Sequence, residues 1–158
     1  MDCDRRARCK NATVNPQPGT TEWHDLVREE IIDPDRPIID PHHHLWRRGE
    51  GMSYDLPDLL ADTRDGHNIV ATVFMECGSA YDPALPPHLA PVGETTFVTE
   101  RSFADPARTI RAIVGKADLT HPALDDILDA HIEAGRGMFR GIRDALSRAD
   151  EPDALTIP

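Results

Sequence analysis

The sequence predicts an α/β fold built on a parallel β-sheet. Segments with the spacing of a strand alternate with segments with the spacing of a helix along most of the 158 residues. One of the expected strands, IVATVFMEC over 69–77, is a nearly unbroken apolar run, which is typical of a strand buried on both faces. Four strand-to-helix steps in a row imply a sheet of four parallel strands.

The first 36 residues are expected to lie outside this sheet. Residues 1–19 combine charged residues with the stretch NPQPGT and show no periodicity, which predicts a disordered tail. Residues 20–36 are expected to form a helical arm that ends at the prolines of DPDRP. Its apolar residues recur at helical spacing: Trp23, Leu26, Val27 and Ile31. The main domain is therefore assigned to 37–158.

The first half of the domain contains two expected strands with a helix between them. The first strand covers 37–44, where apolar residues lead into a run of histidines. Asp55 is expected to cap the helix that follows, because a carboxylate accepts from free backbone N–H groups, and Gly66 follows the last turn of that helix. The second strand covers 69–77.

The second half repeats this pattern. A proline-containing loop over 78–93 is too long for a plain connection, and long loops in compact domains are usually functional or disordered. A weaker helical pattern follows over 94–105, and the third strand covers 110–117. Thr120 is expected to cap the next helix, which carries His121 and His131 and is closed by glycines. The fourth strand covers 139–144.

Composition narrows the classes of partner. The chain has 17 Lys and Arg against 28 Asp and Glu, a formal charge of −11, which argues against a nucleic-acid or anionic-membrane partner. No run reaches the ~20 apolar residues of a membrane helix, and the first residues lack a signal-peptide core, so a cytoplasmic location is expected. Three cysteines fit a reducing compartment, and the spacing of Cys3 and Cys9 matches no common metal motif.

The strongest candidate for chemistry is the histidine run at the end of the first strand. Side chains alternate along a strand, so Asp40, His42 and His44 point one way while His43 points the other. Two converging imidazoles can ligate a divalent metal such as zinc or manganese, with Asp40 holding one ring. Alternatively, the histidines form local hydrogen bonds without a metal. The sequence leaves both readings open.

Several motifs together carry a family resemblance. PIIDPHHHLW, GHNIVATVFMECGSAY, VGET and FRGIR occur in this order within about 21–147. In this set the chain resembles the amidohydrolase-related family of metal-dependent hydrolases, in the branch of sugar-lactone and pyrone-dicarboxylate lactonases. The resemblance implies a partial (β/α)8 TIM barrel, of which 37–158 would be the first half. It also assigns to His42 and His44 the place of the H-x-H pair that closes the first barrel strand.

In such barrels the active site lies at the carboxyl ends of the strands. Glu76 ends the second expected strand and Arg143 the fourth, and both are expected to bind substrate. Glu76 could instead be a solvent-facing acid, and Arg143 could form a salt bridge with a neighbouring carboxylate. The other polar strand ends are Lys116, which is expected to be structural, Asp118 and Asp144.

The expected activity is hydrolysis of a lactone-like cyclic ester or amide that carries a carboxylate. His42 and His44 would act on the scissile carbonyl directly or through the metal, and Arg143 would pair with the carboxylate. The alternatives are a metal-dependent decarboxylase of the same superfamily and a catalytically inactive truncated product. Four strands are half of a barrel, so the chain is expected to be a fragment, inactive alone, that self-associates or joins a complementing C-terminal half.

Overall fold

The computed structural model describes residues 16–17, 20–47 and 53–144. The chain divides into two compact units, and the boundary along the sequence falls between Ile32 and Asp33. Most of the tail expected over 1–19, including Cys3 and Cys9, lies outside the described residues, and so does everything after Asp144.

The described part of the first unit contains one short helix, α1 (Thr21–His24), which Thr20 caps through a hydrogen bond from the Trp23 backbone N–H. The expectation of a helical arm over 20–36 is therefore wrong in extent. No residue of α1 is buried, and Leu26 and Val27 beyond it are 62% and 69% exposed. A helix without a buried face lacks the packing that normally offsets the cost of its nucleation.

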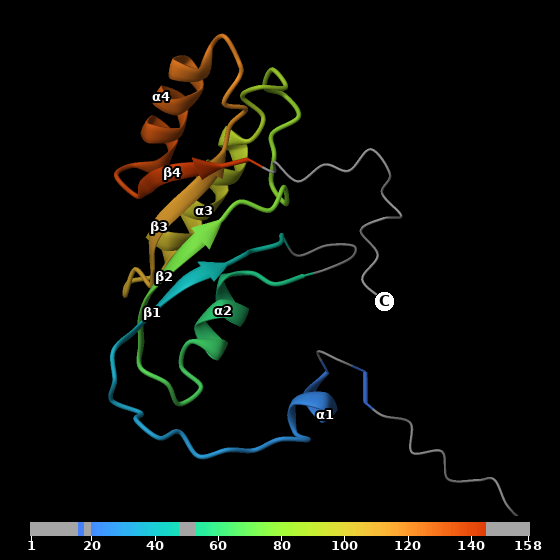
Figure 1. Ribbon diagram of the computed structural model, residues 1–158, viewed down its shortest axis with the longest axis vertical. Coiled ribbons are helices and arrows are strands. Elements are labelled where there is room, and N and C mark those ends of the chain that lie inside the picture. The colour runs from blue at the N-terminus through green and yellow to red at the C-terminus, as the bar shows by residue number, and fades with distance from the viewer. Residues whose placement is uncertain (1–15, 18–19, 48–52, 145–158) are drawn as a thin grey trace, which may run out of the picture. The chain divides into compact units, whose positions relative to one another are not determined.

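The second unit has an α/β fold with a sheet of four parallel strands in chain order. Figure 1 shows these strands side by side, from β1 in cyan to β4 in red. Their bounds confirm the four expected strands to within two residues at each end. The strands are β1 (Ile38–His43), β2 (Ile69–Met75), β3 (Ile110–Lys116) and β4 (Phe139–Arg143).

Three helices connect the strands: α2 (Leu56–Asp62), α3 (Val92–Ala104) and α4 (Leu124–Gly135). Asp55 caps α2 as expected, and the Asp58 side chain completes a capping box with it. None of the helices in the described ranges combines the length and apolar character that a membrane crossing requires.

The start of α4 differs from the expectation. Thr120 is not its cap, because the Thr120 hydroxyl and backbone N–H both donate to the Asp118 carboxylate at 2.6 and 2.8 Å. The turn that results delays the helix to Leu124, so His121 lies before α4 and not on it. The helix ends at Arg136, which adopts the left-handed conformation with φ 46° and precedes Gly137 with φ 87°.

The core lies between one face of the sheet and the helices. Phe74, Ile110 and Ile113 are at most 1% exposed and pack in one cluster with α2 and α3. The helix residues in this cluster are Leu56, Leu59, Phe97 and Val98. The opposite face is only half-buried along β2 and β3, at Ala71, Val73, Met75, Ala112 and Val114.

An ion pair joins the start of α2 to α3. The Asp55 carboxylate accepts from Arg101 Nε at 2.8 Å and from Arg101 Nη2 at 3.1 Å, while it also caps α2. The side chains are 11% and 32% exposed, so the pair is shielded from water. The Arg101 guanidinium also lies over the Phe97 ring, 4.5 Å from its centroid.

Helix α4 packs very closely on β3 and β4. A Cβ on Gly115 would lie 2.9 Å from His131 Cε1, and a Cβ on Gly135 would lie 2.7 Å from Phe139 Cβ, so both positions require glycine. His131 is fully buried and stacks on Phe139. Its Nε2 donates to the Lys116 carbonyl at 3.0 Å, which ties α4 to the carboxyl end of β3.

Candidate active site

The histidines at the end of β1 occupy two different environments. The Nε2 atoms of His42 and His44 lie 3.2 Å apart, with the two rings perpendicular. His43 turns to the other face, where its ring meets Phe74 edge-on and burial lowers its pKa to about 4. The alternation of a strand thus brings His42 and His44 together and separates His43 from them.

Backbone geometry fixes the tautomer of His44. Its Nδ1 lies 2.8 Å from the carbonyl oxygen of Met75, at the end of β2. A carbonyl only accepts hydrogen bonds, so Nδ1 carries the proton and Nε2 of the neutral ring keeps its lone pair. Asp40 was expected to hold a ring, but its carboxylate accepts from the His42 backbone N–H at 3.0 Å. Met75 therefore takes the orienting role that the sequence assigned to Asp40.

The two ring nitrogens fit one part of a metal site. Zinc–nitrogen bonds of about 2.05 Å at a tetrahedral angle place two ligand atoms about 3.3 Å apart, close to the 3.2 Å between His42 Nε2 and His44 Nε2. The backbone carbonyl on His44 Nδ1 is also a common outer partner of a metal-bound imidazole. Among residues 16–17, 20–47 and 53–144, however, no group of three or more His, Cys, Asp or Glu side chains is placed to hold an ion.

Glu76, directly after β2, contacts two further residues at the carboxyl end of the sheet, Arg143 and Tyr81. Its carboxylate accepts from Arg143 Nε at 3.1 Å and from the Tyr81 hydroxyl, and its backbone carbonyl accepts from Arg143 Nη2. The sequence left two interpretations of Arg143, binding of a substrate carboxylate or a salt bridge with a neighbouring carboxylate. The structure contains the salt bridge. The side chain of Glu76 is 12% exposed and that of Arg143 39%, so the arginine remains accessible.

Tyr81 is a member of this cluster that the sequence did not reveal. It lies in the loop after β2, where no periodicity indicates the direction of a side chain. Burial, and then the hydrogen bond to Glu76, raise the pKa of Tyr81 well above its ordinary value, so its hydroxyl stays protonated.

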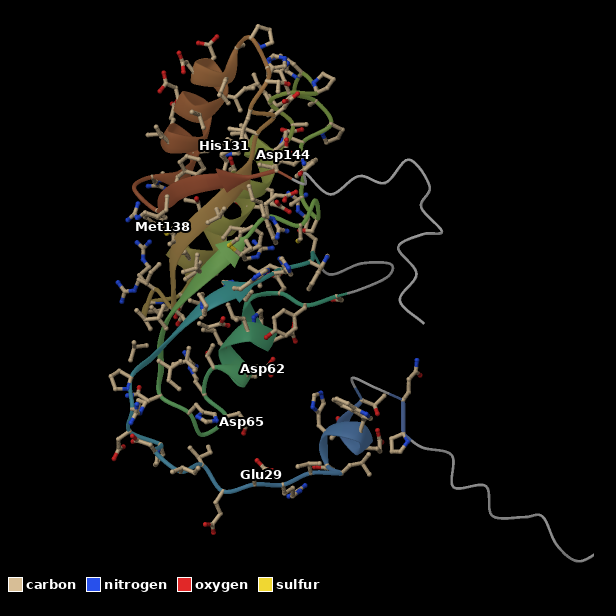
Figure 2. All side chains as sticks on the ribbon, viewed as in Figure 1. Glu29, Asp62, Asp65, His131, Met138 and Asp144 are labelled. Carbon is tan, nitrogen blue, oxygen red and sulfur yellow. The ribbon has the colours of Figure 1, made fainter. Side chains whose placement is uncertain are left out.

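Two of the three remaining polar residues at the strand ends form a second pair. Lys116 Nζ lies 2.9 Å from Asp144 Oδ1, and this hydrogen bond raises the pKa of the lysine. Asp144 is labelled in Figure 2, beyond the end of β4. Asp118 is taken up by its turn, and His121 stacks on His88 with ring centroids 4.6 Å apart.

A buried carboxylate holds the loop after β2 in place. Glu94, in the first turn of α3, is 2% exposed and accepts from the backbone N–H groups of Ser79 at 2.7 Å and Cys77 at 3.3 Å. The Ser79 hydroxyl also donates to the Leu45 carbonyl at 2.6 Å, beside the histidines. Sequence reasoning missed this role, and the signal that could have found it is an acid in the first turn of a half-apolar helix, two residues after Val92.

Comparison with known proteins shows what this chain is similar to. The Uncharacterized protein y4mH of Sinorhizobium fredii (strain NBRC 101917 / NGR234) is 31% identical over an alignment of 131 residues, and 70% of this chain is covered. The chain spans 40% of the length of that protein, whose name assigns no activity. No family model matches the chain, and no solved structure matches it.

Proposed function

We propose that this chain supplies the His42–His44 pair to the active site of a metal-dependent hydrolase related to the amidohydrolases. Its substrate would be a lactone-like cyclic ester or amide that carries a carboxylate. One observation carries the proposal: two Nε2 atoms lie 3.2 Å apart at the carboxyl end of β1, and the Met75 carbonyl fixes the tautomer of His44 whose Nε2 has the lone pair, which accepts from His42 Nε2–H here and would bind a metal after that proton leaves.

The architecture that we propose is the first half of a (β/α)8 barrel. The chain order of the four parallel strands supports this, because consecutive strands of such a barrel are neighbours. The half-buried second face supports it too, since the inner face of a barrel is covered only when the other strands are present. The relative is long enough to contain further units, as the chain spans 40% of it.

The candidate residues at the carboxyl end of the sheet each have a role in this proposal. His42 and His44 would hold a divalent ion such as zinc or manganese, which when bound supplies a Lewis acid for the scissile carbonyl. Arg143 would pair with the substrate carboxylate through Nη1, since its hydrogen bonds to the described residues use Nε and Nη2. Glu76 positions Arg143 by accepting from it at 3.1 Å and would lie beside a substrate that binds to that arginine.

Calorimetry with zinc and the full chain tests the metal part of the proposal. Two nitrogen ligands predict a dissociation constant no tighter than about the micromolar range. His42→Ala and His44→Ala should each abolish binding, whereas His67→Ala, at an exposed histidine in the turn before β2, should not change it. Equal binding by all three variants would refute the assignment.

An assay of the whole protein that carries this sequence tests the reaction. Ring opening of lactones that is lost in His42→Ala supports the hydrolase. Release of carbon dioxide from aromatic acids without ring opening would replace it with the decarboxylase, and inactivity toward both classes would refute both activities.

A further inference from the structure

A second cluster of charged side chains lies at the amino end of the sheet, opposite the end that carries the histidines. Figure 2 labels Met138 and Asp144 at the two ends of β4. Three arginines share a pocket with Met138. This pocket of about 360 Å³ opens at the amino ends of β3 and β4. We call it the amino-end pocket, and its lining residues are Ser102, Arg108, Ile110, Arg111, Met138 and Arg140.

The charge of this pocket is not balanced by neighbouring acids. Within the described ranges, none of the lining residues Arg108, Arg111 and Arg140 takes part in a salt bridge, and neither does Arg136, which lies beside the pocket over the same Phe103 ring as Arg108. The nearby Asp105 is 2% exposed, and its carboxylate accepts from the backbone N–H groups of Ala107 and Thr109. The carboxyl ends of α3 and α4 each contribute about −0.5, so Asp105 and the two helices together leave the three lining arginines with a local charge of about +1.

The structure holds these arginines in place and leaves most of their donors available. Arg111 Nη2 donates to the Ala107 carbonyl at 3.1 Å, and Arg140 Nη1 donates to the Gly137 and Phe139 carbonyls at 2.7 and 2.9 Å. A guanidinium has five N–H donors, so each of these side chains keeps at least three for another partner.

The backbone is strained where the other two arginines are placed. Arg108 has φ 52° and Arg136 has φ 46°, and they are the two non-glycine residues with positive φ in the described part of the chain. Both guanidinium groups lie over the ring of Phe103, at 3.4 and 4.2 Å from its centroid. The positive φ of Arg136 ends α4, so Arg108 alone has a left-handed backbone that no helix end explains.

We propose that the amino-end pocket binds the phosphate group of a small phosphorylated molecule. The planar fork of arginine matches two phosphate oxygens, and several forks around one pocket suit a doubly charged anion. Met138, which is only partly buried, gives the pocket an apolar side chain for the rest of the molecule. The chain as a whole carries −11 and repels anions, so binding requires this local cluster. The site is independent of the histidine pair.

Titration calorimetry of the full chain with inorganic pyrophosphate tests this proposal, in EDTA so that no metal bridges the anion to the histidines. We expect saturable binding to one site that weakens as sodium chloride is added. Arg111→Gln should weaken it at least ten-fold, and Arg111→Lys should restore part of it. The matched control is Arg47→Gln, which removes the same charge beyond the carboxyl end of β1 and should leave binding unchanged.

Three outcomes would overturn the proposal. They are no saturable binding at millimolar pyrophosphate, equal losses in Arg111→Gln and Arg47→Gln, and unchanged binding in Arg111→Gln together with Arg108→Gln. Circular dichroism melts identify any variant that fails to fold. In that case, phosphorus NMR titration of the unmodified chain at several salt concentrations decides whether pyrophosphate binds.

Discussion

The Asp55–Arg101 ion pair allows a quantitative test of how α2 is fixed to α3. In Asp55→Ala the helix loses its cap, at about 1 kcal/mol, and Arg101 loses a two-pronged charged hydrogen bond, at about 2 kcal/mol. The free energy of unfolding should therefore fall by about 3 kcal/mol. In a chain of 158 residues this corresponds to a melting temperature lower by about 10 °C.

Urea denaturation followed by circular dichroism measures this change. A double-mutant cycle with Asp55→Ala and Arg101→Ala separates the pair from the lost cap and from the lost contact of Arg101 with Phe97. We expect a coupling energy of about 2 kcal/mol, because the side chains are only 11% and 32% exposed.

The matched control is Asp33→Ala, which breaks the exposed pair with Arg36 and should cost about 0.5 kcal/mol or less. A coupling energy for Asp55 and Arg101 as small as this control would refute the reasoning, because it would mean that the pair is solvated in solution.

Three further predictions concern α4 and the strand ends. Gly115→Ala should lower the free energy of unfolding by about 2 kcal/mol because its Cβ would meet His131 at 2.9 Å, whereas Gly141→Ala, with no atom within 4 Å of its Cβ, should not; equal denaturation midpoints would contradict this. Burial lowers the pKa of His131 in the folded state, so below about pH 6.5 the unfolded chain takes up the proton first and stability should fall as the pH falls; denaturation at pH 7, 6 and 5 should show this slope, and His131→Gln should reduce it. In an alkaline absorbance titration of a variant without the other tyrosine, Tyr81 should ionise only far above pH 10, and Glu76→Gln should lower its midpoint; an unchanged midpoint would show that the hydrogen bond does not form.

The sequence predicted the elements whose signals are local. Strand bounds follow from runs of apolar residues, and the Asp55 cap follows from the chemistry of one residue next to an apolar pattern. Prediction failed where two local signals compete. Thr120 has the chemistry of a cap, but the Asp118 carboxylate two residues earlier offers a shorter-range partner and forms a turn.

The candidate site also contains one contact that the sequence predicted and others that it did not. His42 and His44 are two residues apart on one strand, so alternation alone predicts their convergence. Glu76 and Arg143 are 67 residues apart, and their pairing depends on the register of three strands. Tyr81 reaches Glu76 from a loop, where side-chain direction follows no period. Such contacts depend on tertiary structure, which no pattern along one chain specifies.

The chain order of the strands also has a consequence for how the protein folds. Each strand pairs only with the one before it and the one after it, and paired residues are roughly 30 positions apart in the chain. Closing loops of this length is fast compared with pairing the ends of a whole domain. The sheet can therefore grow one strand at a time as the chain leaves the ribosome. At each stage the newest strand is an unpaired edge, and it is protected from aggregation only when the next strand arrives.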